Sequence, residues 1–207
     1  MSSSTEQPNS ATIFDPHATR TGISNKKLTM WLFLASDCMF FGTLISTHLI
    51  YRRLAPDVVD PSQIFDVGLT CFATVILLLS SYMMALTSSA AKEGNMLKFR
   101  FSLLGVVALG TIFLASLGYE YHHLLHEFEL GLSSNIFAST FYLLTGTHGV
   151  HVAVGLLWLL SWFFYSFKKG LNLKSAAEDV ESLSLYWHFV ELVWVVIFTL
   201  VYLIEFI

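Results

Sequence analysis

The strongest constraint on the fold is a set of five apolar segments, each long enough to cross a lipid bilayer as a helix. A hydrocarbon core about 30 Å thick needs about 20 apolar residues in helical form. Only 13% of the 207 residues are charged and 55% are hydrophobic, which is typical of a membrane protein. We therefore predict an all-α, polytopic bundle of five transmembrane helices, at about 28–51, 67–91, 99–119, 136–167 and 183–207.

The polar stretches between these segments predict the orientation of the chain. Residues 1–26 are rich in Ser and Thr and lack the apolar region of a signal peptide, so we expect a flexible cytoplasmic tail before one membrane domain, residues 27–207. Nine Lys and Arg residues fall in the tail and in the second and fourth loops, against only Arg52 and Arg53 on the opposite side. The positive-inside rule then predicts a cytoplasmic N-terminus and a C-terminus outside.

Several classes of function find no support in the sequence. The phosphate-binding, HExxH and GxSxG motifs are absent, and the 11 basic residues form no stripe that would bind nucleic acid. Cys38 and Cys71 both fall inside predicted helices without the spacing of a metal site, so we expect them to be packing residues. We predict no catalytic residue and no metal site in this chain.

The ionisable residues inside the apolar segments are the candidate functional residues. Charged groups at membrane depth are costly and usually face a bundle interior or a wet cavity. With a rise of 1.5 Å per residue, five of them fall near one depth, and we predict a buried polar layer contributed by three helices. Two pairs within it are spaced i,i+3 and so share a helical face. The layer comprises Asp37, His148, His151, His188 and Glu191.

Three interpretations of this layer stay open. It supports the movement of protons, or it is a structural clasp of hydrogen bonds between helices in which the carboxyl groups are protonated. The third interpretation is a bis-histidine haem site, which needs one histidine from each of two facing helices. His148 or His151, together with His188, would supply that pair.

A second polar group follows the third apolar segment, in the stretch "YEYHHLLHEFE". It predicts an outer polar cluster of Glu120, His122 and His123. His122 and His126 are spaced to share one helical face, with Glu129 nearby, which would suit an adventitious zinc site. We prefer the interpretation that this stretch is a loop facing a partner protein.

Four blocks of the sequence resemble a known family of membrane proteins. They are "WLFLASDCMFF", "GYEYHHLL", "FYLLTGTHGVHVAVGLLW" and "YWHFVELVWVVIFTLVYL", which are distributed over most of residues 28–202. The blocks are similar to subunit III of the haem-copper oxygen reductases, the terminal oxidases of aerobic respiration, in its five-helix bacterial form. That resemblance implies a V-shaped cleft that holds lipid.

The resemblance also implies a non-catalytic subunit of a proton-pumping oxidoreductase in the bacterial cell membrane. Such a subunit has no redox centres and supports proton uptake by catalytic subunit I, which carries haem and copper. Its other partners would be the remaining oxidase subunits, phospholipids in the cleft and, as a larger assembly, a respiratory supercomplex. By position, Asp37 resembles the family's buried carboxylate that reacts with carbodiimides. The family's recurring polar set is matched by His148, His151, His188, Glu191 and Glu120.

Two departures from the family pattern bear on the electron donor. Asp37 is shorter than the Glu of most members that oxidise cytochrome c and resembles the members that oxidise quinol, whereas Glu191 replaces a commoner Asp. We expect cytochrome c oxidase, with quinol oxidase as the alternative. A proton-coupled carrier is a less favoured alternative, because the helix number is odd and no inverted repeat is visible.

Overall fold

The described residues of the computed structural model are 24–54, 67–127, 131 and 134–203. They form the helices α1 (Asn25–Leu54), α3 (Val67–Glu93), α4 (Met96–Glu127), α5 (Ile136–Tyr165) and α6 (Ala177–Ile197), and the π-helical segment η1 (Phe198–Leu203). Across this part of the chain the prediction of an all-α fold is confirmed, and five helices are long and apolar enough to span a membrane. Nearly all of the predicted N-terminal tail, residues 1–23, lies outside the described residues.

The largest extensions beyond the predicted helix bounds are at the end of α4 and at the start of α6. Helix α4 continues past the predicted end at residue 119 to Glu127, and α6 begins at Ala177, six residues before the predicted start. Both extensions are polar, so an apolar criterion stops short of them although the backbone hydrogen bonds continue. The acidic Glu178 and Asp179 lie in the first turn of α6, where negative charge stabilises a helix.

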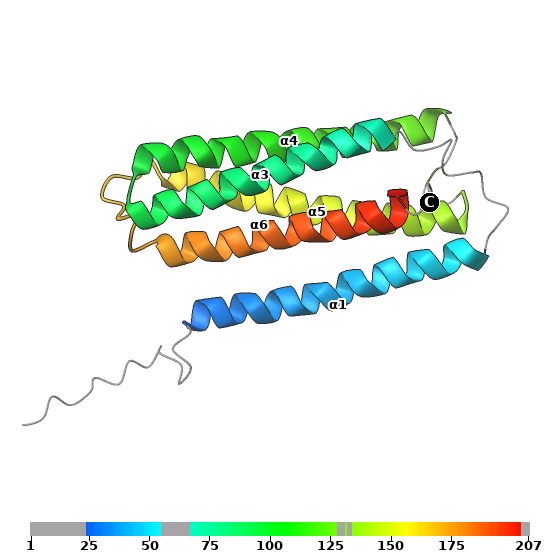
Figure 1. Ribbon diagram of the computed structural model, residues 1–207, viewed down its shortest axis with the longest axis horizontal. Coiled ribbons are helices and arrows are strands. Elements are labelled where there is room, and N and C mark those ends of the chain that lie inside the picture. Colours follow the sequence, from blue (N-terminus) through cyan, green and yellow to red (C-terminus); the bar gives the residue numbers. More distant parts are fainter. Residues whose placement is uncertain (1–23, 55–66, 128–130, 132–133, 204–207) are drawn as a thin grey trace, which may run out of the picture.

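Four helices form a bundle and α1 lies along one side of it (Figure 1). Helix α3 packs on α4 and α6, α5 packs on α4 and α6, and α1 contacts α5 and α6. Ion pairs join Lys26 to Asp179 at 2.6 Å and Lys27 to Glu181 at 3.1 Å, with Lys92 3.9 Å from Glu181. They place the beginnings of α1 and α6 and the end of α3 at one end of the bundle, which we call the N-terminal side.

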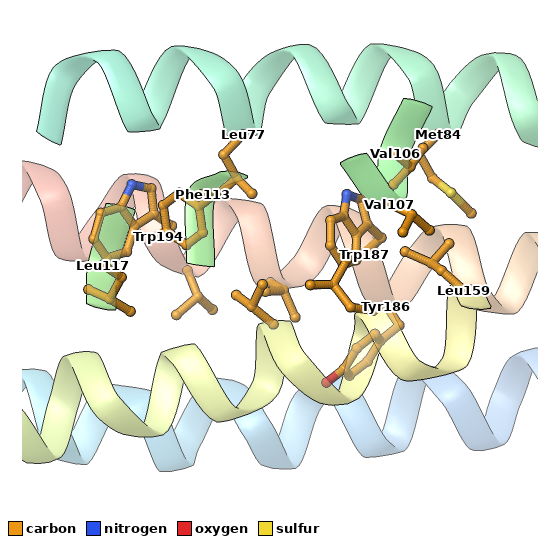
Figure 2. Close-up of a cluster of buried hydrophobic side chains, with 14 of the residues drawn as sticks. Leu77, Met84, Val106, Val107, Phe113, Leu117, Leu159, Tyr186, Trp187 and Trp194 are labelled. Atoms are coloured by element: carbon orange, nitrogen blue, oxygen red, sulfur yellow. The ribbon is translucent and has the colours of Figure 1, made fainter. Parts of the chain in front are cut away.

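The two tryptophans of α6 form the centre of the core. Figure 2 shows Trp194 and Trp187 at two positions along α6, among aliphatic and aromatic side chains of the neighbouring helices. Trp187 is fully buried and sits in a slot that two glycines leave open. A Cβ atom at Gly110 of α4 would lie 2.8 Å from its ring, and one at Gly155 of α5 would lie 3.0 Å from it. Small residues therefore let α4 and α5 approach the indole closely.

Candidate functional site

Asp37 and His151 come together between α1 and α5. Oδ2 of Asp37 lies 4.0 Å from Nε2 of His151, and the two side chains are only 13% and 22% exposed. This distance suits an ion pair but exceeds a direct hydrogen bond. The structure therefore brings two residues of the predicted polar layer into one contact across the interface of α1.

The surroundings of His151 determine which of its nitrogens faces Asp37. Its Nδ1 lies 2.8 Å from the carbonyl oxygen of Thr147, which can only accept, so Nδ1 carries a hydrogen. The hydroxyl of Tyr186 donates to the His151 carbonyl at 2.9 Å, and the Phe41 ring meets the imidazole edge-on at 5.0 Å. Nε2 is thus the ring nitrogen that faces Asp37, at 4.0 Å from its carboxylate oxygen.

A groove of about 910 Å³ lies between α1, α5 and α6 on the N-terminal side of this pair. His151 lines the groove, and most of its other lining atoms are apolar, from residues such as Met30, Phe33 and Trp158. Lys26 and Asp179 also line it, and their ion pair lies at the N-terminal side. The groove therefore combines an apolar body, a charged end and, in its wall, the His151 side chain that faces Asp37.

His188 and Glu191 take no part in the Asp37 contact, so the residues of the predicted polar layer lie in separate contacts. They face α3, where Nδ1 of His188 lies 2.8 Å from the Ser81 hydroxyl and 3.3 Å from Oε2 of Glu191. Ser80 donates to Oε1 of Glu191 at 2.8 Å and accepts from the Trp187 indole at 3.0 Å. The Asp37–His151 contact is therefore made between α1 and α5, whereas the His188–Glu191 contact is made between α6 and α3.

His148 makes neither of these contacts. It is fully buried, stacked on Trp194 at 5.1 Å between ring centroids and met edge-on by Phe41 and Phe113. Neither ring nitrogen has a hydrogen-bond partner within the described chain. His148 therefore packs as an aromatic ring, whereas His188 is hydrogen-bonded towards α3. In the part of the chain that the structure describes, no three His, Cys, Asp or Glu side chains are grouped as a metal site.

The predicted outer cluster is also divided, and its residues are helical rather than part of a loop. Glu120 is 8% exposed and points into the core, where it accepts a hydrogen bond of 3.2 Å from the Tyr202 hydroxyl. His123 pairs with Glu127 at 3.1 Å, and the exposed His122 ring lies 4.2 Å from that of His126. Consecutive helical positions are rotated by about 100°, so these neighbours in sequence face different surroundings. Glu129 lies outside the described residues.

Sequence reasoning missed the polar residues of α3, which supply most partners of the buried groups. Thr74 accepts from the Trp194 indole at 3.0 Å, Thr70 lies 3.5 Å from Glu120, and Ser80 and Ser81 bind the α6 pair. The available signal was the recurrence of Ser and Thr along one apolar segment. Small hydroxyl residues of this kind are enriched where membrane helices meet.

Comparison with known proteins gives one consistent result. The sequence model of the family described as "Cytochrome c oxidase subunit III" matches residues 9–205. Cytochrome c oxidase subunit 3 of Bacillus subtilis is 40% identical over 179 residues, 86% of each chain. The protein of the same description from Synechocystis sp. is 38% identical over 174 residues, 84% of this chain and 73% of the other. Quinol oxidase subunit 3 of Bacillus subtilis is 33% identical over 176 residues, 85% of each.

Proposed function

The chain belongs to the cytochrome c oxidase subunit III family, the accessory subunits of haem-copper oxidases, and we propose that it serves an oxidase whose electron donor is cytochrome c. It is a multi-pass protein of the bacterial plasma membrane. Members of this family have no redox centres of their own, and they associate with the catalytic subunit and the other oxidase subunits. The chemistry of oxygen therefore takes place in a partner, and this chain supports it.

The proposed support is to hold phospholipid and to assist proton uptake by the catalytic subunit. One observation carries it: the groove beside α1 has a mainly apolar wall that includes His151, the neighbour of Asp37, and the Lys26–Asp179 pair lies at its charged end. An acyl chain fits the apolar wall, and a phosphate group suits Lys26 electrostatically. Asp37 and His151, 4.0 Å apart, give the same region two ionisable side chains through which protons are exchanged.

The orientation is proposed from the charges. On the N-terminal side lie Lys26, Lys27, Lys92, Lys98, Arg100, Lys168, Lys169 and Lys174, whereas Arg52 and Arg53 lie at the other end of α1. The excess of Lys and Arg in short loops supports a cytoplasmic N-terminal side. The groove would then open towards the compartment from which protons are taken up.

Quinol oxidase remains the second candidate for the parent complex. It is favoured by the quinol oxidase subunit 3 that is 33% identical, and by Asp37 in place of the Glu usual in the cytochrome c group. The two candidates differ in a directly measurable property of the purified complex. A complex that oxidises quinol and not reduced cytochrome c would replace the first candidate by the second.

Co-purification tests the proposed partner. A tagged copy of the chain, purified from native membranes in mild detergent, is expected to bring down a catalytic subunit that carries haem and copper. Subunits are identified by mass spectrometry, and haem by its visible spectrum. Recovery of the chain without such a subunit would contradict the proposal. A Soret band in the isolated chain would also contradict the proposal, because a subunit that binds haem would itself be a cytochrome.

Asp37→Asn is expected to affect proton uptake and lipid retention more than oxygen reduction. The initial rate of oxygen consumption should change by less than about twofold, which corresponds to about 0.4 kcal/mol of barrier, because Asp37 lies in a subunit without redox centres. The number of protons taken up per oxygen molecule reduced, followed with a pH-sensitive dye, and the phospholipid content of the purified complex should both fall. Cys38→Ser, at the next and exposed position of α1, is the control. An immediate complete loss of oxygen reduction in an assembled complex would contradict this role.

A further inference from the structure

A second groove, between α3 and α6, is lined mainly by polar side chains. It has a volume of about 440 Å³ and its lining includes Ser88, Ser89 and Lys92 of α3 and Glu181, Ser184 and His188 of α6. Lys92 and Glu181 lie at the N-terminal side, where Glu181 also pairs with Lys27 of α1. Hydroxyl groups therefore line a route from a charged mouth to an imidazole.

The inner end of this groove leads to a buried carboxylate. His188 is 39% exposed as a side chain, whereas Glu191, one helical turn further along α6, is 5% exposed. Nδ1 of His188 lies 3.3 Å from Oε2 of Glu191, and Ser80 fixes the other carboxylate oxygen at 2.8 Å. From the start of α6, His188 is about 16 Å and Glu191 about 21 Å along the helix at 1.5 Å per residue. One imidazole therefore separates the groove from a carboxylate near the middle of the span.

We infer that the α3–α6 groove is a hydrated access route that delivers protons from the N-terminal side through His188 to Glu191. Water in the groove protonates Nε2 of His188, the Nδ1 proton passes to Oε2 of Glu191, and imidazole and carboxylic acid remain. The pair thereby takes up one proton, and its net charge changes from −1 to zero. This proton-binding site is separate from the Asp37–His151 pair. The inference rests on the proposed function, because a working oxidase draws protons from this side of the membrane.

The charged and titratable groups around this route come from several helices. Lys92 at the mouth and Lys27 of α1 both pair with Glu181, so these three groups together carry a net charge of +1. His148 of α5 stacks on Trp194 of α6, and its ring nitrogens make no hydrogen bond to Glu191. Towards α3 the partners of the pair are the hydroxyls of Ser80 and Ser81, which can both donate and accept.

Access of water is tested by cysteine labelling in the assembled oxidase in membranes. Cys38 and Cys71 are first replaced by Ala, and Ser184→Cys is then introduced in the groove. Leu104→Cys on α4 is the control on an apolar surface: it lies at a similar distance along its helix and is 49% exposed, against 7% for Ser184. A charged, membrane-impermeant thiosulfonate should label Ser184→Cys about tenfold faster, because the reactive thiolate forms in water and not in apolar surroundings. Equal labelling rates at the two positions would overturn the access route. That result would not depend on the co-purification experiment, which tests the proposed function.

Proton binding is tested by infrared difference spectra recorded as the pH is lowered. The parent complex should gain a carboxylic acid band that is absent in Glu191→Gln and present, at a shifted frequency, in Glu191→Asp. Glu120→Gln is the reference variant: Glu120 is buried at the other end of the bundle, and its replacement should leave that band in place. A band that survives unchanged in Glu191→Gln would overturn the assignment to Glu191. The labelling experiment uses no variant of Glu191 and gives its result even if Glu191→Gln does not assemble.

Discussion

Gly110→Leu is expected to prevent α4, α5 and α6 from packing. A Cβ atom at Gly110 would lie 2.8 Å from Cη2 of Trp187 and 2.9 Å from Cδ2 of Leu156, so a longer side chain meets two buried groups at once. Both neighbours are enclosed by other core residues and have little room to move. Overpacking of this kind should lower the free energy of unfolding by at least about 3 kcal/mol. Thermal unfolding of the purified complex in detergent, together with its yield, measures the effect.

A control on the same helix separates overpacking from a general intolerance of leucine. Gly118 is exposed and has no atom within 4 Å of an added Cβ, so Gly118→Leu should unfold close to the parent temperature. Gly110→Ala adds only the Cβ atom, so it should lower the free energy of unfolding by less than Gly110→Leu does. Equal losses for Gly110→Leu and Gly118→Leu would refute the role assigned to the slot.

Ser80→Ala is expected to cost about 2–4 kcal/mol of stability, because it leaves two buried groups without their partner. The Ser80 hydroxyl is fully buried, donates to Glu191 at 2.8 Å and accepts from the Trp187 indole at 3.0 Å. Alanine fills nearly the same volume, so the loss comes from hydrogen bonding and not from a cavity. Thermal unfolding of the assembled complex again provides the measurement.

Ser36→Ala is the matched control for this second prediction. Its hydroxyl is exposed and donates to the backbone of Phe33 within α1, so its removal should change the unfolding free energy by less than about 0.5 kcal/mol. A Ser80→Ala complex that unfolds at the temperature of the Ser36→Ala complex would show that the Ser80 bridge contributes little. A loss of stability at Ser80 alone would support the hydrogen-bonded junction of α3 with α6.

The number of helices and the family could be predicted from the sequence, because both depend on properties that the chain carries locally. Apolar length determines whether a segment can span a bilayer, and the blocks around Asp37, His151 and Glu191 carry the family resemblance. The polar ends of α4 and α6 were missed because a helix continues for as long as its backbone is hydrogen-bonded, whether or not its side chains are apolar.

The residues of the predicted layer lie in different contacts. Asp37 and His151 lie on helices that pack together, and their side chains come within 4.0 Å of each other. His188 and Glu191 lie on the α3 face of α6, and Glu120 points inward while His122 points outward. The partners Ser80, Ser81 and Thr70 were not predicted, since a single hydroxyl in an apolar segment usually bonds its own backbone and gives no sign of a distant partner.

The sequence by itself determined how many times this chain can cross a membrane, which residues carry ionisable groups at depth, and to which family the chain belongs. Only the tertiary structure decided that Asp37 pairs with His151 while Glu191 pairs with His188 and α3. The physical reason is that the rise per residue fixes how deep a side chain lies along its helix. The direction in which it points depends on the rotation of each helix about its axis, which is set by the packing of Trp187 and Trp194 against the neighbouring helices.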